Sequence, residues 1–588
     1  MLTRRYFITL LQQKKEVPVA GISPEPGLER EWIKNTAYCG VKAWNCPFPL
    51  WLAEELQQEL SRLLTAAGGL SLSRLARKLS ARAEKWGWPG AGRWVDVPRR
   101  ETILAGVFLH QERFSRLLPE ILPGRFLTIR EIAGSLSQAG LGITDGILEF
   151  LLHLEVLNGR VERLAGVGLD ETGRFACRRC GERDRIGEDF SPEPPFTCRV
   201  CESCLALGPV TGMQPFYCWR GALPKKARGG APLLTLPELT PWQKATAREV
   251  LAFWEREKRR SFLVWAVCGA GKTEVVFLTI KRALAEGKRV LLTVPRREIV
   301  KELGERVKKC FPGLAFTLLY GGKKEEHPGG GLVVATTHQL LRFTPFFHLV
   351  ILDEADAYPY RGNRMLTGAL LNSLLPEGKL IYMTATPGEE WRKKAVRGEI
   401  GLSRLVLRHH GYPLPVPGLV KTALPPAEEK NWKVPPPVLS FLGEAKRKKR
   451  KVLIFSPTVR LTEKVGQALQ GVKEGFAVDY IHSRDPRKDW KLKEFEGGRL
   501  HVLVTTTLLE RGLTFPHLDV IVLYADREEI FSTETLVQIA GRVGRSSLDP
   551  SGEVLFAGEK ISGQMQNARL WIDGMNKEAK KLGFLKRK

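Results

Sequence analysis

A phosphate-binding loop is indicated by five consecutive residues, Gly269, Ala270, Gly271, Lys272 and Thr273. Glycines let backbone N–H groups approach a phosphate without a side chain in the way. The charge of Lys272 suits the terminal phosphates of a nucleotide, and the Thr273 hydroxyl suits Mg²⁺. The apolar run Phe262–Val267 predicts a strand before the loop, and Glu274–Leu284 has helical periodicity after it. Strand, glycine turn and helix N-terminus together predict an ATP site.

A cluster of carboxylates follows further along the chain, at Asp353–Asp356. It comes directly after the apolar run Leu349–Leu352, which predicts a buried strand. Asp353 suits a contact to Mg²⁺, and Glu354 suits activation of the attacking water. An acidic surface turn would have a similar composition. Its position at a strand end, downstream of a phosphate loop, favours the catalytic interpretation.

Near the C-terminus, a glutamine and two arginines stand at Gln538, Arg542 and Arg545. Arginines three apart are expected on one helical turn, from which they can face a γ-phosphate as an arginine finger. Gln538, one turn earlier, is expected to join the same catalytic site. The apolar runs Val452–Phe455 and Val502–Val504 predict strands of a second parallel sheet ahead of these residues. An ATP site between two lobes is therefore expected.

Five clustered cysteines predict a metal site. Cys177 and Cys180 form one C-x-x-C pair, and Cys198, Cys201 and Cys204 offer two choices for a second pair. Four thiolates from two such pairs match structural zinc, whereas redox-active cysteines are the alternative interpretation. We expect Cys201 and Cys204 to complete the set, because Cys198 follows a proline-rich segment that is expected to be extended. Cys198 stays open as an alternative ligand.

The composition points to a polyanionic partner. The 588 residues carry 91 Lys and Arg against 64 Asp and Glu, a formal net charge of +27. Such an excess favours nucleic acid or an anionic membrane surface, although a basic protein without such a partner is the alternative. No apolar run reaches 18 residues, and the apolar stretch Tyr6–Leu11 is too short for a secretory signal. A cytoplasmic location is expected, where thiols bind metal rather than pair.

The part of the chain before the cysteines is less readable. Thr128–Glu131 is a capping box opening a helix, Ile147–Leu157 predicts a second helix, and Arg160–Leu164 predicts a strand. Helix, turn, helix and hairpin suggest a winged-helix module, and other small helical domains fit as well. Six tryptophans stand before it and suit core packing, a partner surface or base stacking, namely Trp32, Trp44, Trp51, Trp86, Trp88 and Trp94.

Taken in order, the motifs from Leu239 to about Phe556 resemble a superfamily-two helicase with two RecA-like lobes. With a four-thiolate module just before the first lobe, and Asp353–Tyr360 as an extended carboxylate motif, the chain is similar to the late competence protein ComFA family. The resemblance covers roughly residues 165–560. It implies an ATP-driven motor that pulls incoming single-stranded DNA into the cytoplasm. Residues 1–120 match nothing in that pattern.

The resemblance also implies roles for single residues. In this superfamily a glutamine ahead of the loop reads adenine, and this role falls to Gln243; a helix N-terminus capped by Thr240 accounts for the same residues. Contact with the nucleic-acid backbone is implied for three residues after predicted strands, Arg296, Thr336 and Thr505. A solvated arginine is the alternative for Arg296. Coupling of ATP state to lobe movement is implied for Thr384 and Thr386.

The expected fold class is therefore α/β, with two RecA-like parallel-sheet lobes preceded by a zinc module and a mainly helical N-terminal region. The expected boundaries are 1–120 for an N-terminal region of unknown fold, 121–168 for the winged-helix module, 169–228 for the zinc module, 238–390 for the first lobe, 391–436 for a connection, 437–560 for the second lobe and 561–588 for a basic C-terminal helix.

The expected function is an ATP-dependent single-stranded DNA translocase with ATP, Mg²⁺ and Zn²⁺ in its sites. The resemblance implies other competence proteins as partners, namely a membrane DNA channel and a cytoplasmic ComF-type protein. It also allows an oligomer and a peripheral position at the inner face of the membrane. One alternative is a PriA-type replication-restart helicase, whose zinc cysteines lie within the second-lobe half. Another is a DNA-binding scaffold without motor activity, which the intact Lys272, Glu354 and Arg545 disfavour.

Overall fold

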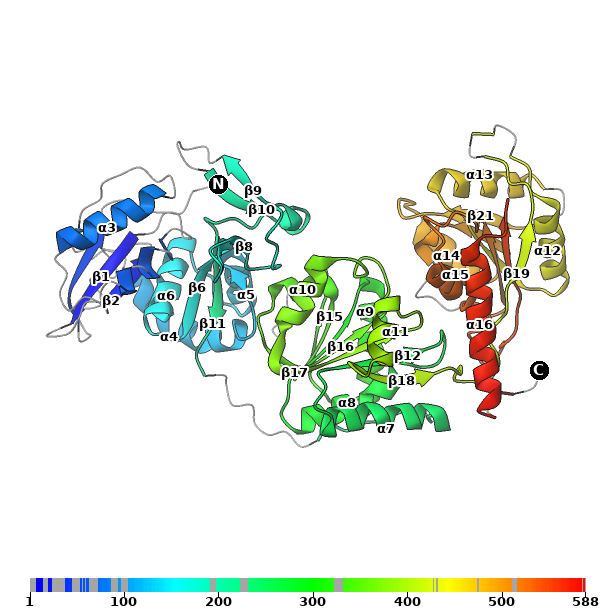
Figure 1. Cartoon of the computed structure of the whole chain (residues 1–588), viewed down its shortest axis with the longest axis horizontal. Helices are drawn as coiled ribbons and strands as arrows, with labels where there is room; N and C mark the ends of the chain where they lie inside the picture. Colours follow the sequence, from blue (N-terminus) through cyan, green and yellow to red (C-terminus); the bar gives the residue numbers. More distant parts are fainter. Residues whose placement is uncertain are drawn as a thin grey trace.

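The computed structural model describes most of the chain from residue 104 onward and short stretches before it. The described residues are 7–13, 19–23, 38–44, 53–54, 56–58, 60–62, 72–85, 94–96, 104–190, 197–222, 231–321, 331–426, 428–429, 432–472, 475–509, 515–583 and 585–586. The molecule is elongated, with the N-terminal elements at one end, a first α/β lobe in the middle and a second α/β lobe at the other end (Figure 1).

In the described part of the chain, the first lobe contains a parallel sheet of seven strands in the order β14-β15-β13-β16-β17-β12-β18. Its central strands are Val-, Leu- and Ile-rich and buried, as parallel strands covered on both faces must be. The strands are β12 (Ser261–Ala266), β13 (Val290–Val294), β14 (Phe316–Leu319), β15 (Leu332–Thr336), β16 (Phe347–Asp353), β17 (Leu374–Thr384) and β18 (Gly401–Leu405). The helices are α7 (Pro241–Arg256), α8 (Glu274–Ala285), α9 (Arg297–Cys310), α10 (Arg364–Ser373) and α11 (Glu389–Val396), with the short 3-10 helix η2 (Thr337–Arg342).

The second lobe has a parallel sheet of six described strands in the order β19-β24-β23-β20-β22-β21. The strands are β19 (Gly418–Lys421), β20 (Lys451–Phe455), β21 (Val478–Ile481), β22 (Val502–Thr505), β23 (Leu518–Leu523) and β24 (Val554–Gly558). The helices are α12 (Pro436–Arg447), α13 (Val459–Gln470), α14 (Lys488–Glu496), α15 (Thr533–Ala540) and α16 (Gly563–Lys581). The two parallel sheets give the chain its α/β fold with two RecA-like lobes, as the sequence predicts.

The passage between the lobes contributes strands to both. β18 pairs with β12 at the edge of the first sheet, and β19 pairs with β24 at the edge of the second. Residues 406–417 lie between these two strands. This stretch is shorter than the expected connection at 391–436. The C-terminal helix α16 also touches the first lobe, because Trp571 packs edge-on against Trp265 and Glu578 pairs with Arg404. The two lobes therefore share contacts beyond the ATP site.

At the N-terminus, the described residues form a four-stranded sheet and helices. The sheet has the order β2-β1-β3-β4, and the apolar stretch Tyr6–Leu11 overlaps its strand β1. The elements are β1 (Phe7–Gln13), β2 (Val19–Ser23), β3 (Tyr38–Trp44), β4 (Trp94–Asp96) and α3 (Leu72–Lys85). This sheet was not predicted from the sequence, because its strands lack a clear alternation of apolar and polar residues.

The next unit combines three helices with three strands. Its elements are α4 (Leu104–Ile121), β5 (Leu127–Thr128), α5 (Ile129–Gln138), α6 (Asp145–Leu157), β6 (Val161–Ala165) and β11 (Pro215–Trp219). The two expected helices and the expected strand are α5, α6 and β6. The capping box at Thr128 and Glu131 has both of its hydrogen bonds. The partner of β6 is β11, which lies between β5 and β6 and follows the cysteines in the chain. The cysteine-bearing segment is thus inserted between paired strands of this unit.

This cysteine-bearing segment consists of two small antiparallel hairpins. The first pairs β7 (Val167–Leu169) with β8 (Phe175–Cys177), and the second pairs β9 (Ile186–Phe190) with β10 (Thr197–Cys201). It packs on the first lobe, where a Cβ added at Gly368 of α10 would lie 3.0 Å from the Cys180 carbonyl oxygen. The close approach explains a glycine at this point of α10.

The unit around α5 also holds the first lobe directly. The backbone N–H of Phe126 donates to the Arg342 carbonyl at 2.7 Å, and Thr344 donates to the Gly124 carbonyl at 2.9 Å. The guanidinium of Arg342 pairs with Glu131 at 3.0 Å. These contacts attach the unit just before β16, the strand that ends in Asp353.

Among the residues that the structure describes, no helix combines the length and the apolar character needed to cross a membrane.

Candidate nucleotide-binding site

The carboxyl ends of three adjacent strands build the site. β12, β17 and β16 are neighbours in the first sheet. The glycine loop follows β12, Thr384 is the last residue of β17, and the carboxylates stand at the end of β16. Ligands of open α/β sheets bind at this edge of the sheet. The fold therefore brings together motifs that are separated by about a hundred residues of chain.

The glycine loop needs glycine at two positions. Gly269 has φ +81° and Gly271 has φ +70°, conformations that side chains disfavour. A Cβ on Gly271 would also collide with the side-chain amide nitrogen of Gln243. That amide donates to the Ala270 carbonyl at 2.8 Å, and its oxygen accepts from Thr240 in a capping box at the start of α7. Gln243 thus caps its helix and contacts the loop at the same time.

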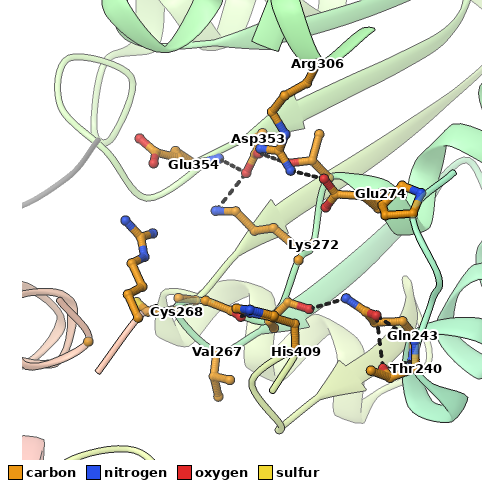
Figure 2. Close-up of a pocket in the computed structure, with 18 of the residues that line it drawn as sticks. Thr240, Gln243, Val267, Cys268, Lys272, Glu274, Arg306, Asp353, Glu354 and His409 are labelled. Carbon is orange, nitrogen blue, oxygen red and sulfur yellow. Dashed lines mark hydrogen bonds and ion pairs between the residues drawn. The ribbon is translucent and has the colours of Figure 1, made fainter. Parts of the chain in front are cut away.

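Lys272 and Asp353 meet in the centre of the site (Figure 2), and Thr273 also contacts Asp353. The Lys272 ammonium lies 2.8 Å from Asp353 Oδ1, and the Thr273 hydroxyl donates to Asp353 Oδ2 at 3.4 Å. Burial opposes the charge of Lys272, but the nearby carboxylates of Asp353 and Glu354 outweigh it and raise the pKa of this lysine. A hydroxyl and a carboxylate side by side are the oxygen donors that Mg²⁺ takes beside nucleotide phosphates.

Glu354 adopts an unusual backbone conformation at the end of β16. Its φ is +53°, in the left-handed region that a glutamate rarely occupies, and its N–H donates to Asp353 Oδ1 at 2.7 Å. Strained residues of this kind concentrate at functional sites. In Figure 2 the Glu354 side chain extends away from Glu274 and Arg306, so the carboxylates of Asp353 and Glu354 face different parts of the site.

A cavity of about 470 Å³ lies over these residues and takes its walls from both lobes. The first lobe contributes Gln243, the loop 267–273, Asp353 and Glu354, and the second contributes Gln538, Gly541, Arg542 and Arg545. The ion pair of Arg306 with Glu274 lies at one side of it (Figure 2). A site of this size, with a lysine and three arginines among its walls, suits a nucleoside triphosphate.

The two arginines stand after α15, not on it. The helix ends at Ala540, and Gly544, with φ +63°, interrupts any helical continuation between Arg542 and Arg545. The expectation of one regular helical turn is therefore wrong, although both residues do line the cavity. Burial lowers the pKa of Arg542 to about 9, and the neighbouring charge of Arg545 adds to this effect. Two adjacent guanidinium groups form a strongly electropositive wall that favours an anion between the lobes.

A buried network connects the lobes beside this wall. Gln538 of α15 donates from Nε2 to Asp356 Oδ2 at 3.3 Å and to the Thr386 hydroxyl at 3.2 Å. The Thr386 hydroxyl in turn donates to Asp356, and its backbone N–H donates to the Thr384 hydroxyl at 3.0 Å. The Cys268 thiol donates to Gln538 Oε1 at 3.1 Å. Gln538 therefore connects the glycine loop, the carboxylate motif and the threonine loop.

The residues expected to contact DNA are less well placed for it. Thr336 is 6% exposed and Thr505 is fully buried. In this arrangement neither threonine offers its side chain to a nucleic-acid backbone. Arg296 is partly exposed at the start of α9 and lies outside the cavity residues.

Four of the five clustered cysteines come together, as two C-x-x-C pairs. The sulfurs of Cys177, Cys180, Cys201 and Cys204 all lie within 4.8 Å of one another, with 3.9 Å between Cys177 and Cys204 and 3.6 Å between Cys180 and Cys201. Tetrahedral zinc with Zn–S bonds of about 2.3 Å puts its sulfurs roughly 3.8 Å apart, so the geometry fits Zn²⁺. Cys198 is outside this group, and its thiol donates to the Arg199 carbonyl at 3.6 Å.

Comparison with known proteins agrees with this geometry. Residues 236–389 match the family model "Type III restriction enzyme, res subunit", and residues 437–547 match "Helicase conserved C-terminal domain". The competence protein ComFA of Bacillus subtilis (strain 168) is 33% identical over 80% of this chain and 97% of its own length. The chain belongs to the ComFA family. ComFA of Streptococcus pneumoniae (strain ATCC BAA-255 / R6) is 34% identical over 70% of this chain and 92% of its own length.

A solved structure, "S. cerevisiae Dbp5 bound to RNA and ADP BeF3", is also similar, at 18% identity and a TM-score of 0.43 over 59% of this chain and 94% of that chain. Together, the ComFA kinship and the two helicase models make this chain an ATP-dependent superfamily-two helicase, a DNA-dependent ATPase associated with competence.

Three residues at the site escaped the sequence analysis. His409 lines the cavity, Arg408 lies fully buried behind it, and Arg306 pairs with Glu274 beside the loop. Arg408 and His409 stand in a proline-rich passage with no motif around them, and Arg306 lies on the charged face of an amphipathic helix. Only the three-dimensional arrangement identifies them.

Proposed function

We propose that this ComFA-family chain is a translocase that moves along single-stranded DNA at the expense of ATP and draws transforming DNA into the cytoplasm. The observation that carries the proposal is the cavity between the lobes, because it combines Lys272 and Glu354 from one lobe with Arg542 and Arg545 from the other. A nucleotide held by both sides would bring the lobes together, and its hydrolysis would release them.

In this proposal each residue has a stated task. Lys272 neutralises the terminal phosphates, and Gln243, beside the loop, recognises the adenine. Glu354 accepts the proton of the attacking water at its carboxylate. Arg545 and Arg542 stabilise the charge that develops on the γ-phosphate as it departs. Mg²⁺ would be held by Thr273 and Asp353 and would neutralise phosphate charge when bound.

Lobe movement is the step that turns hydrolysis into translocation. Gln538 contacts Asp356 and Thr386 across the lobes, so it can transmit the state of the site to the threonine loop. Two DNA-binding surfaces, one on each lobe, would then bind and release the DNA strand in turn. The net charge of +27 supports binding to a polyanion. Arg296 is the DNA-contact candidate that fits this role without rearrangement of a buried side chain.

The remaining parts of the proposal concern the surroundings of the motor. The four-cysteine segment would hold structural Zn²⁺, and the unit around α5 and α6 would act as a winged-helix module. The chain would work at the inner face of the membrane with a DNA channel and a cytoplasmic ComF-type partner, as an oligomer or a single copy. Kinship with ComFA supports this setting.

Displacement of streptavidin from biotinylated oligonucleotides tests the proposed movement. The full chain with ATP should strip streptavidin from single-stranded DNA, and the Lys272→Ala variant should not. ATP turnover should rise with single-stranded DNA and much less with blunt duplex of the same length. Turnover that ignores single-stranded DNA, or stimulated turnover without displacement, would contradict a translocase.

A further inference from the structure

The connection between the lobes passes directly behind the ATP site. It leaves the first sheet at Leu405, the end of β18, and within three residues it reaches Arg408, which is 1% exposed. Arg408 belongs to none of the helicase motifs. A fully buried arginine is costly to desolvate, and hydrogen bonds from its guanidinium offset part of that cost.

The guanidinium of Arg408 binds the turn that follows α15. Its Nη1 donates to the carbonyls of Val543 at 2.8 Å and Gly544 at 2.6 Å, and its Nη2 donates to the Gly541 carbonyl at 3.3 Å. These carbonyls lie beyond Ala540, where α15 ends, and buried backbone carbonyls require hydrogen-bond donors. A planar guanidinium with several fixed donors matches such a cluster far better than an ammonium does.

The carbonyls that Arg408 binds belong to the finger turn, residues 541–545, which carries both proposed finger arginines. Gly541 precedes Arg542, and Val543 and Gly544 separate Arg542 from Arg545. This segment is a turn with φ +63° at Gly544, so no regular helix fixes the direction of either arginine. His410 adds a further restraint, because its Nε2–H donates to the same Gly544 carbonyl at 3.0 Å.

The other side of the connection holds the glycine loop. His409 donates to the Gly269 carbonyl from its backbone N–H at 3.1 Å and from its ring Nδ1–H at 2.9 Å. One short stretch, residues 408–410, thus binds the apex of the phosphate loop with one residue and the finger turn with its two neighbours.

We propose that Arg408 is a positioning residue for ATP hydrolysis, which fixes the finger turn so that Arg545 reaches the γ-phosphate, and that His409 links this position to the glycine loop. Arg408 is set behind the cavity wall and outside the residues that line it, so its effect passes through Arg545. Burial lowers the pKa of Arg408 to about 10, with Arg545 adding to the effect, so the group remains a cation at neutral pH.

The inference rests on the proposed finger role of Arg545, and a double-mutant cycle separates the two. Arg408→Met keeps the length of the side chain and removes its donors. It should lower kcat on the order of 100-fold, the usual loss when one transition-state donor is misplaced, while the affinity for a fluorescent ATP analogue changes little. Arg408→Lys keeps the positive charge but lacks the planar guanidinium, so its kcat should lie between that of Arg408→Met and that of the parent.

The variant that combines Arg408→Met with Arg545→Ala tests the inference. If Arg408 acts through the finger, Arg408→Met adds almost nothing to Arg545→Ala, because the second change removes what the first misplaces. Losses that multiply would overturn the inference. So would a loss of ATP affinity equal to the loss of kcat, which indicates a general structural role. An Arg545→Ala variant with normal turnover would instead refute the finger proposal itself.

Two controls make the result specific. Arg397→Met removes an arginine of the same lobe whose guanidinium pairs with Glu399 at 3.6 Å on the surface, and kcat should stay near the parent value. If Arg408→Met does not yield folded protein, the same cycle is run with Arg408→Lys, for which additivity with Arg545→Ala again overturns the inference.

Discussion

The ammonium of Lys272 lies 2.8 Å from the carboxylate of Asp353, so the proposed phosphate-binding lysine and the proposed magnesium ligand are paired with each other. Each has a different partner in a nucleotide complex, because Lys272 suits the phosphates and Asp353 suits the metal ion. In this pair each side chain compensates the charge of the other, whereas a single buried charge would have no such compensation. Nucleotide binding must therefore replace this one ion pair by two new interactions. Substitution of Lys272 or Asp353 should consequently affect the protein differently from substitution of Glu354.

Replacing Lys272 and replacing Glu354 should give distinguishable defects. Lys272→Ala should weaken ATP binding and also leave Asp353 without its cation. Glu354→Gln should keep ATP bound and slow hydrolysis on the order of 100-fold or more, since the amide cannot accept the proton. Equilibrium nucleotide binding beside steady-state turnover measures both. Lys281→Ala, further along the same helix α8, serves as the matched control and should behave like the parent. Equal loss of affinity in the Glu354 variant would argue against its role as the base.

Arg545→Ala should spare nucleotide affinity far more than it spares turnover. Its guanidinium stands on the second-lobe wall of the cavity, where, in the proposed mechanism, it would meet the γ-phosphate as charge develops there. A loss in kcat on the order of 100-fold with a Kd close to the parent value is the expected result. Arg545→Lys should stay slow as well, because an ammonium lacks the planar fork. Parallel losses in kcat and affinity would show that Arg545 only helps to hold ATP.

Local patterns made the candidate catalytic residues predictable from the sequence, whereas long-range packing did not. Asp353 and Glu354 stand at the end of one apolar strand and Lys272 follows another within six residues, and a parallel sheet gathers strand ends at one edge. Arg408 contacts carbonyls more than 130 positions away, and no spacing rule describes such a contact. Buried arginines of this kind become visible only when the fold is known.

The same reasoning explains the other differences. Five cysteines left two choices of ligand pair, and only the fold showed that Cys198 is outside the group. The partner of β6 lies beyond the whole cysteine segment, so a hairpin search around Arg160–Leu164 could not find β11. Thr505 stands at a strand end as the motif requires, yet its side chain is buried, because position in a motif does not determine exposure.

DNA binding should depend strongly on salt and weakly on sequence. Backbone contacts by Lys and Arg release counterions, so log K falls linearly with log[salt], with a slope of roughly −0.7 per neutralised phosphate for single strands. Fluorescence anisotropy with labelled homopolymer and mixed oligonucleotides at several salt concentrations measures this slope. Arg296→Ala should reduce it by about one contact, roughly 0.7, if Arg296 touches a phosphate. A flat plot, or a strong preference for one sequence, would contradict a motor that reads the backbone.

The last prediction concerns metal content. Single Cys→Ser changes at Cys177, Cys180, Cys201 and Cys204 should each lower the zinc content of the purified chain, because each removes one of four thiolates that lie within 4.8 Å of one another. Cys198→Ser is the matched control in the same segment, and it should retain about one zinc per chain. Elemental analysis of the purified variants provides the measurement.

Loss of the metal should unfold the cysteine segment, since four clustered thiols gain their order from the ion that they bind. The effect on the ATP site should be small. The unit around α5 holds the first lobe through Phe126 and Glu131, whose bonds to Arg342 do not involve the cysteines. Metal-depleted protein should therefore bind a fluorescent ATP analogue nearly as the parent does, but bind DNA or its partners less tightly. If Cys198→Ser loses zinc and Cys204→Ser keeps it, the ligand assignment is wrong. A parent chain purified without any zinc would refute the zinc site as a whole.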